Sequence, residues 1–254
     1  MSILQIYLSI LSFAVTAPAY GADSPRIVTG EVIANRSVTL ATRIVGRINQ
    51  VHASEGDEVT RDMTVVEIDD TEFRAQLRSA EADEDRAKAE LDHRKRVKDR
   101  LERLTQNNAV SQDAIDEAVY GLDVAKANLK KAQAQREAIR STLAETRIKA
   151  PFDAVVIRKY AEVGMVTQPG QALYDIQDQS KLKFRARVKE DDLAHIQLAD
   201  EAMITISALS DAPISASVIR IIPSGDDRHT FTIELGLPDS PGLFPGMFGK
   251  AVFE

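Results

Sequence analysis

The side chains that could support acid–base or metal chemistry are scattered through this sequence. No histidine has a second histidine or a carboxylate at metal-ligand spacing; the four are His52, His93, His195 and His229. Asp69-Asp70 and Asp191-Asp192 are adjacent acids, and adjacent side chains on a strand point to opposite faces, so we interpret both pairs as turn or capping residues. Phosphate-binding loops, G-x-G-x-x-G and G-x-S-x-G motifs are absent from the sequence. We therefore predict no catalytic residue, no metal site, no cofactor and no enzymatic activity.

Composition excludes further classes of function. The 254 residues are 44% hydrophobic and 28% charged, which is typical of a globular chain. The formal net charge of −7 argues against nucleic acid as a partner. Cysteine is absent, so disulfides, thiolate metal sites and cysteine nucleophiles are excluded.

The N-terminus resembles an export signal. An apolar run from Ile3 to Ala17 is followed by small residues, and cleavage after Gly21 or Ala22 fits this pattern. The residues before the run lack Lys and Arg, and the run is shorter than the ~20 residues that cross a bilayer. An exported protein is the main interpretation, with an uncleaved anchor or a buried segment as alternatives.

Proline and glycine divide the rest of the chain. Residues 72–145 contain no Pro and only Gly121, which predicts long helix. The flanks are rich in Val, Ile and Thr and predict short strands. These flanks also resemble each other, because an offset of 108 residues aligns segment 44–70 with segment 152–178, including Gly56 with Gly164. Neither half can bury its apolar face alone, so we expect the two to pack into one β-sandwich around a helical insertion.

The insertion has a heptad pattern. In its second arm large residues alternate with small ones at seam positions: Ile115, Ala118, Leu122, Ala125, Leu129, Ala132, Ile139 and Leu143. Charged residues interrupt the seam at Glu84, Arg94, Lys98 and Arg136. Each arm of about 34 residues spans roughly 50 Å, so the turn at 107–111 lies far from the strands and predicts a partner contact. A solvated spacer is the alternative, and the thin seam favours lateral self-assembly.

The C-terminal part predicts a further β domain. Alternating apolar residues follow Lys181, "DDLAHI" suggests a short helix, and a hairpin is expected around Pro223–Arg228. Five or six antiparallel strands over residues 180–254 fit a small barrel.

Several ordered motifs now resemble one family. They are Gly46-Arg47-Ile48, Glu55-Gly56-Asp57, the set Thr146, Ile148, Ala150, Pro151, Phe152 and Asp153, and Pro245-Gly246-Met247. The sequence is similar over residues 27–254 to the periplasmic adaptors of tripartite efflux pumps, the membrane fusion proteins of the HlyD and RND type. The resemblance implies an α+β fold: an elongated, split lipoyl-like β-sandwich with an inserted antiparallel α-helical coiled-coil hairpin, followed by a small antiparallel β-barrel.

The resemblance also assigns segments and site residues. It implies an export signal at 1–22, lipoyl-like halves at 27–71 and 147–179, the hairpin at 72–146 and the barrel at 180–254. Family hairpin tips that meet an outer-membrane channel carry an Arg, a Leu four residues later and a Ser seven after that, matched here by Arg100, Leu104 and Ser111. Arg100 can donate hydrogen bonds and Leu104 can supply an apolar knob, whereas Ser111 can cap the second helix or bond across the interface.

The implied partners are an inner-membrane transporter, most consistent with the RND type, a TolC-type outer-membrane channel, and further copies of the chain in a hexamer. The implied location is the periplasm, at the inner membrane through the pump. An ABC exporter or a type I secretion system remains the alternative, although about five heptads per arm suit RND-type pumps better.

Some features depart from the family pattern. Asp62 and Ala154 stand where the family usually has Gly, and each would be strained if its turn needs φ > 0. The chain ends a few residues after Met247, so we expect the family's membrane-proximal domain to be missing.

A lipoyl or biotinyl carrier is a different class of function on a similar sheet. Such carriers present a modified Lys at a hairpin turn, but no Lys lies between Val28 and Leu77, and Lys149 precedes the second repeat segment, 152–178. The sequence therefore argues against a carrier.

Overall fold

The chain forms two compact units. The structure is a computed structural model that describes residues 26–105, 111–209, 212–226 and 229–253. One unit comprises residues 33–183, together with 243–245; the other holds the remaining strands near the two ends of the chain. The predicted export signal at 1–22 lies outside the described residues.

The first unit contains two four-stranded sheets. Their orders are β2-β9-β7-β4 and β6-β5-β3-β8. Every sheet takes two strands from each half of the repeat; the strands are β2 (Arg36–Ala41), β3 (Gly46–Val51), β4 (Glu58–Val59), β5 (Thr64–Ile68), β6 (Arg147–Lys149), β7 (Ala154–Lys159), β8 (Val166–Thr167) and β9 (Ala172–Asp178). The expectation that segments 44–70 and 152–178 pack together is thus confirmed.

The strands repeat with the offset seen in the sequence. β3, β4 and β5 begin 108 residues before β7, β8 and β9, respectively. Turn geometry repeats as well, since Gly56 and Gly164 both have φ of 89°. Asp62 has φ of 64° and its counterpart Gly170 has φ of 84°. Asp62 therefore occupies the left-handed conformation that its turn was expected to require, at a modest cost for an Asp.

Ala154 does not share this strain. It lies in β7, pairs with Val59, and is not among the described residues with positive φ, so the expectation of strain there is wrong. Its counterpart Gly46 serves a different purpose, because a Cβ on Gly46 would collide with the side chain of Ile68. Close packing, rather than a turn conformation, explains the glycine at that position in the first half.

One apolar core fills the space between the two sheets. Its fully buried side chains come from both halves, including Ile48, Val65, Leu173, Tyr174 and Ile176. The Tyr174 hydroxyl donates to the Ala53 carbonyl at 2.6 Å, which satisfies the one polar group of that side chain inside the core. Burial raises the pKa of Tyr174 above its ordinary value.

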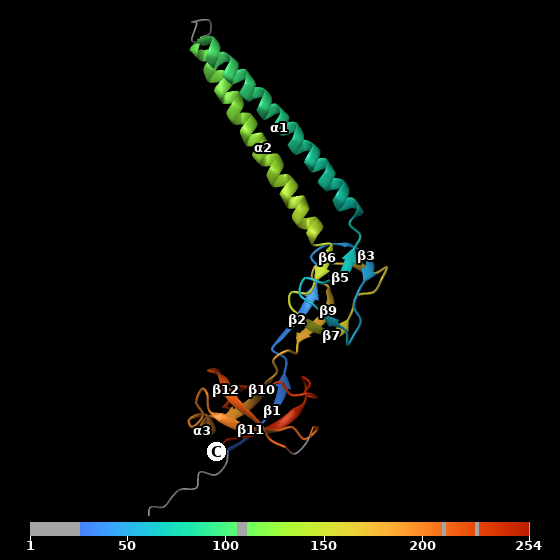
Figure 1. The fold of residues 1–254 in the computed structure, drawn as a ribbon, viewed down its shortest axis with the longest axis vertical. Helices are drawn as coiled ribbons and strands as arrows, with labels where there is room; N and C mark the ends of the chain where they lie inside the picture. The colour runs from blue at the N-terminus through green and yellow to red at the C-terminus, as the bar shows by residue number, and fades with distance from the viewer. Residues whose placement is uncertain (1–25, 106–110, 210–211, 227–228, 254) are drawn as a thin grey trace, which may run out of the picture. The chain divides into compact units, whose positions relative to one another are not determined.

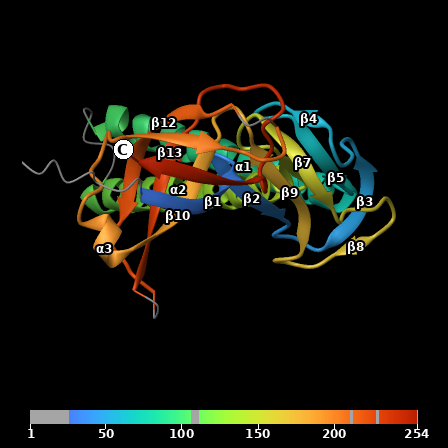
Figure 2. The same ribbon diagram turned by 90° about the horizontal axis from the view of Figure 1, so that it is seen from below.

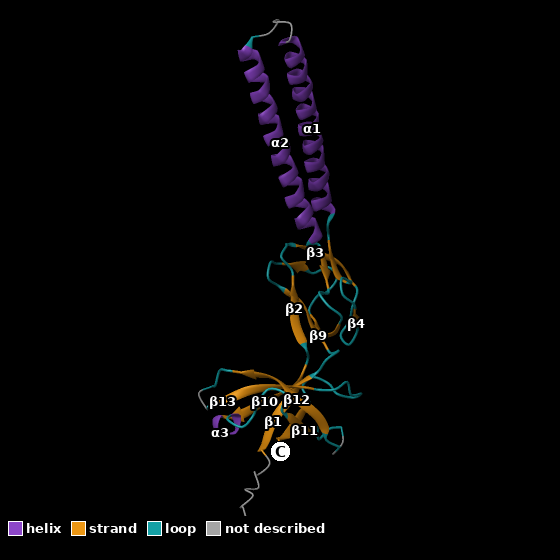
Figure 3. Ribbon diagram, turned by 60° about the vertical axis from the view of Figure 1, so that its left-hand side comes forward, coloured by secondary structure: helices purple, strands orange, loops and turns teal. Residues whose placement is uncertain are grey.

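Two long helices are inserted between two strands that pair with each other. α1 (Thr71–Thr105) follows β5, α2 (Gln112–Ala144) precedes β6, and β5 pairs antiparallel with β6. The helices lie side by side, as Figures 1 and 3 show. Glu84 contacts Gln133, and Arg94 lies next to Gly121, so the helices run antiparallel. Whether they wind into a coiled coil stays a prediction.

The second unit is a closed six-stranded barrel in the order β1-β10-β13-β12-β11-β14. Its elements are β1 (Arg26–Ile33), β10 (Lys183–Lys189), the short helix α3 (Glu190–Leu193), β11 (Glu201–Thr205), β12 (Ile214–Ile222), β13 (Thr230–Gly236) and β14 (Phe248–Phe253). The predicted short helix and the antiparallel hairpin of β12 and β13 are both present.

β1 corrects the sequence-based division of the chain. Residues from 27 onward were placed in the sandwich, but β1 pairs with β14, with Val28 opposite Ala251. Figure 2 shows β1, in blue, beside orange and red strands of the barrel. Val28 and Val32 are buried in the barrel. β1 lies between β14 and β10, so this strand from the start of the chain closes the barrel.

Candidate functional site

The predicted tip residues lie at one end of the hairpin. Arg100 is exposed in α1, and Leu104, one turn later, is 41% exposed although it is apolar. Four residues apart, the two side chains share one face of the helix. Among the described residues Arg100 has no hydrogen-bond or ion-pair partner, so this face is available for contact. The predicted turn itself, residues 106–110, lies outside the described residues.

Ser111 begins the second helix. It has extended backbone angles (φ −77°, ψ 155°), and its hydroxyl accepts a hydrogen bond from the amide of Ala114 at 3.4 Å. This is the geometry of an N-cap, so the capping role considered for Ser111 is present. The side chain is also exposed. Because α1 ends at Thr105 and the antiparallel α2 begins at Gln112, Ser111 lies at the same end of the hairpin as Leu104.

The base of α1 is anchored by the paired acids. Asp69 accepts hydrogen bonds from the Thr71 amide at 3.0 Å and from its hydroxyl at 2.7 Å, and these bonds lower the pKa of Asp69. Asp70 forms an ion pair with Arg74 at 2.8 Å, one turn into the helix, and that contact lowers the pKa of Asp70. The two carboxylates therefore fix where the helix starts, as the capping interpretation predicted.

The end of α2 is anchored by Thr146. Its buried hydroxyl donates to the Leu143 carbonyl at 2.7 Å, and its carbonyl accepts from the Ile68 amide at 2.8 Å. Thr146 thus satisfies a free carbonyl of the last turn and joins the helix end to β5.

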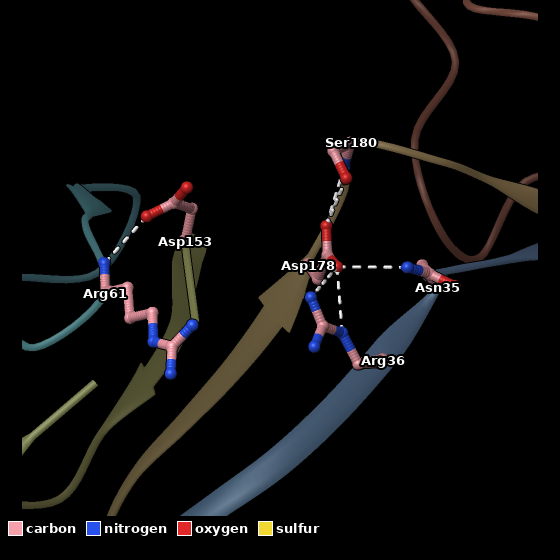
Figure 4. A network of polar contacts seen from close by, with 6 residues as sticks. All are labelled: Asn35, Arg36, Arg61, Asp153, Asp178 and Ser180. Atoms are coloured by element: carbon pink, nitrogen blue, oxygen red, sulfur yellow. Dashed lines mark hydrogen bonds and ion pairs between the residues drawn. The ribbon is translucent and has the colours of Figure 1, made fainter. Parts of the chain in front are cut away.

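Residues 150–153 follow Thr146 in the same family motif. They hold the sandwich closed where the chain returns to it from the helices. Ala150 is fully buried and exchanges backbone hydrogen bonds with the 62–63 turn. Phe152 is buried, with the Arg36 guanidinium 4.3 Å above its ring. The Asp153 carboxylate accepts from the Arg61 amide at 2.7 Å, as Figure 4 shows. The motif therefore has a structural purpose, which is to position the base of the helices.

A second polar cluster was missed by the sequence analysis. Asp178, at the end of β9, is 2% exposed and accepts hydrogen bonds from Asn35, Arg36 and Ser180 at 2.6–3.0 Å (Figure 4). Burial alone would raise the pKa of Asp178, but these hydrogen bonds more than offset it and hold the pKa well below its ordinary value. The cluster ties the first strand of the sandwich to its last. A Ser two residues after the Asp was the only signal, and nothing in the sequence pointed to Arg36.

The interruptions of the helical seam match each other across the hairpin. Glu84 accepts from Arg136 at 2.8 Å and from Gln133 at 3.3 Å, so the break in one helix meets the break in the other. Arg94 lies over Gly121, where the missing side chain leaves room for its stem. Ala80, Ala87 and Ala132 line a groove of about 650 Å³ between the helices, which confirms how little side-chain volume fills the seam.

Two of the four histidines lie close to a carboxylate. His52 lies 3.6 Å from Glu67 and His229 lies 3.7 Å from Glu190, contacts that sequence spacing did not reveal. Within the described part of the chain, no group of three His, Cys, Asp or Glu residues is placed to hold a metal ion. Nor does any described helix combine the length and apolar character needed to span a membrane.

A sandwich split by an antiparallel helical pair, together with a six-stranded barrel, defines a class of protein. The CzcB-like barrel-sandwich hybrid domain model matches residues 36–178, more than half of the chain. The chain therefore belongs to this family, that of the membrane fusion proteins, or periplasmic adaptors, of efflux pumps. Members of this family are adaptors and not enzymes.

Individual proteins and solved structures are also similar to this chain. The chain is 25% identical over 239 residues to multidrug resistance protein MdtA from Cronobacter turicensis, covering 89% of this chain and 58% of that protein. MacA from Actinobacillus actinomycetemcomitans has a similar structure, with a TM-score of 0.77, 20% identity, and coverage of 90% of this chain and 78% of that one. The membrane fusion protein Spr0693 from Streptococcus pneumoniae R6 aligns with a TM-score of 0.71 and 17% identity, over 89% and 97% of the two chains. This chain spans just over half the length of MdtA.

Proposed function

We propose that this protein is a periplasmic adaptor that links an inner-membrane RND-type efflux transporter to a TolC-type outer-membrane channel. In this proposal residues 1–22 direct export, and several copies assemble side by side into a tube, as a hexamer. The hairpin tips dock on the channel, and the β units face the transporter. The transporter supplies the energy, since the adaptor catalyses no reaction.

The observation that carries the proposal is the form of the hairpin tip. Arg100 and Leu104 are exposed on one face at the end of a rod whose base is anchored by Asp69, Asp70 and Thr146. An exposed Leu beside an Arg without a described partner stabilises nothing within the described chain. It does fit a partner surface that offers an apolar hollow and acceptor oxygens.

The transporter type is inferred from the hairpin length. α1 has 35 residues and α2 has 33, about five heptads each. This length suits the RND-type pumps better than the longer hairpins of secretion adaptors, so an ABC exporter or a type I secretion system is the second candidate. Cross-linking in cells followed by co-purification from membranes identifies the inner-membrane neighbour directly.

The tip assignment is tested by a double variant, Arg100→Asp with Leu104→Ala. We expect it to abolish cross-linking to the channel while circular dichroism and thermal unfolding stay unchanged. The matched control is Arg78→Asp with Val124→Ala, which alters an exposed Arg and an equally exposed (41%) apolar side chain away from the tip. Normal cross-linking by the tip variant would contradict the assignment, as would an equal loss in the control.

A further inference from the structure

The six-stranded barrel carries a groove that none of the predictions so far has used. Its volume is about 660 Å³, which is within the range of pockets that hold small molecules. The residues that line it come from β1, β10, β12, β13 and β14, and all of them belong to the barrel unit. We call this feature the barrel groove.

Two arginines of β10 line the barrel groove, and only one of them has a partner. Every second residue of β10 from Phe184 to Val188 is fully buried inside the barrel. Successive side chains of a strand point to opposite faces, so Arg185 and Arg187 point outward, roughly 7 Å apart. Arg185 forms an ion pair with Glu234 at 3.2 Å. The Arg187 side chain has no hydrogen bond or ion pair with any residue that the structure describes.

The nearby acids do not neutralise Arg187. The Glu234 side chain is 4% exposed and lies 3.2 Å from Arg185 and 3.5 Å from Arg220, so its charge is shared between those two cations. Glu31 lines the groove, but within the described part of the chain it forms no ion pair. The lining therefore holds two arginines against one glutamate, a formal charge of +1.

Two threonines lie on the strands that flank Arg187. Thr29 is in β1 and Thr232 is in β13, the two neighbours of β10 in the barrel, and both line the groove. Neither hydroxyl has a hydrogen-bond partner among the described residues. A guanidinium offers five N–H donors and each threonine one O–H donor. The middle of the groove is therefore rich in free donors, which is the chemistry that recognises a carboxylate or a sulfonate.

Apolar side chains form the outer parts of the groove. Phe248 of β14 is 72% exposed, more than any other large apolar side chain that the structure describes. Ile222 of β12 is half-buried and lines the groove beyond β13. A ring or a short aliphatic chain can pack against either of these side chains and remove apolar surface from water.

We infer that the barrel groove binds a small organic monoanion, with a carboxylate or sulfonate on an aromatic or aliphatic body. Arg187 and the two threonines hold the anionic group, while Phe248 and Ile222 cover the body. Glu31 selects for a single negative charge, because a dianion brings its second charge beside this carboxylate. This site is independent of the protein partners proposed above, and it gives the chain a ligand of its own.

Calorimetric titration of the full chain with 4-iodobenzoate tests the chemistry of the site. We expect saturable binding, and binding at least about tenfold weaker for neutral 4-iodobenzamide, which has the same ring, because it lacks the charge that Arg187 recognises. Arg187→Gln should weaken 4-iodobenzoate binding about tenfold, as expected for hydrogen bonds to a charged group. Lys189→Gln is the matched control, since Lys189 is an exposed cation on the same face of β10 outside the groove. Absence of binding, equal affinity for the two probes, or an equal loss in both variants would overturn the inference.

Tryptophan fluorescence tests where the ligand binds, because the native chain has no Trp. We expect 4-iodobenzoate to quench Phe248→Trp saturably through its iodine atom, with the affinity found by calorimetry. Phe244→Trp is the control, since Phe244 is 58% exposed but lies outside the groove, and it should show only the linear quenching of free probe. Equal quenching of the two variants would overturn the assignment to the groove.

A lipid surface is the competing occupant that the same chemistry admits. Binding to phosphatidylglycerol vesicles that depends on Arg187, without binding of 4-iodobenzoate, would overturn the inference in favour of a membrane contact. All of these variants leave the hairpin intact. Cross-linking to the channel should therefore stay normal in each of them, so a failure of ligand binding is distinguishable from a failure of the proposed adaptor function.

Discussion

The sandwich and the hairpin belong to one unit, but they bury their apolar side chains to very different extents. In the sandwich, side chains from both halves form a single continuous core, with Ile48, Leu173 and Ile176 fully buried. In α1 and α2 the described side chains that are buried are only Ala80, Leu122 and Ala125. The sandwich is therefore stabilised from within, whereas the hairpin leaves most of its surface to water or to other molecules. From this contrast we predict that the sheets supply most of the stability and that the proposed binding surface lies on the helices.

The largest expected effect compares a core leucine with a seam leucine. Leu173→Ala removes a fully buried side chain and should lower the free energy of unfolding by about 3–5 kcal/mol. Leu129→Ala, in the half-buried seam of α2, should cost about 1–2 kcal/mol, because its surroundings are already open. Urea unfolding measures both values. Equal losses would show that the hairpin seam is as important for stability as the sandwich core.

The next effect concerns the closure of the sandwich by Asp178. Asp178→Asn removes a buried carboxylate that accepts charged hydrogen bonds, and it should cost about 2–3 kcal/mol at neutral pH. Because the pKa of Asp178 is lowered in the folded state, its stabilisation is complete above the ordinary carboxyl pKa of about 4 and is lost as the pH falls below it.

The difference in unfolding free energy between wild type and Asp178→Asn should therefore shrink below about pH 4. Asp175→Asn is the comparison on the same strand: this half-buried acid accepts hydrogen bonds only from the neutral hydroxyls of Thr39 and Tyr160, so its replacement should cost less, about 1 kcal/mol. A difference for Asp178→Asn that is independent of pH would contradict the proposed charged cluster.

A smaller effect is expected at the matched breaks of the helical seam. Glu84→Arg alone should destabilise the hairpin by about 1–2 kcal/mol, since it places a cation against Arg136. Combining it with Arg136→Glu should recover most of the loss, as measured by helical circular dichroism during thermal unfolding. No recovery in the double variant would show that the two breaks are independent.

The smallest effect distinguishes the two halves of the repeat. Asp62→Gly should stabilise the protein by about 0.5–1 kcal/mol, because φ of 64° costs Gly nothing. Gly170→Asp at the equivalent turn should destabilise it by a similar amount. Chemical denaturation measures both, and changes of the same sign would contradict the equivalence of the turns.

Much of this architecture could be predicted, because it follows from patterns along the sequence. The 108-residue offset located the paired strands, and the absence of Pro and Gly located the helices. What could not be predicted depends on contacts between distant residues. β1 reads as an ordinary strand, and its place in the barrel follows from the need to pair with β14. Asp178 and Arg36 are 142 residues apart, with no shared motif. In the sequence, Glu84 and Arg136 appear only as interruptions of the apolar seam. Their ion pair depends on the register of the two helices, which the sequence does not give.

The central claim is that the sandwich folds without the hairpin, and that the proposed function of the hairpin is to bind the outer-membrane channel. Because β5 pairs antiparallel with β6, residues 70–145 can be replaced by an Asn-Gly turn that joins the two strands directly. The most direct measurement follows both cooperative unfolding and channel cross-linking of this shortened protein. We predict a single cooperative unfolding transition and complete loss of cross-linking. A shortened protein that fails to fold, or that still cross-links to the channel, would contradict the account.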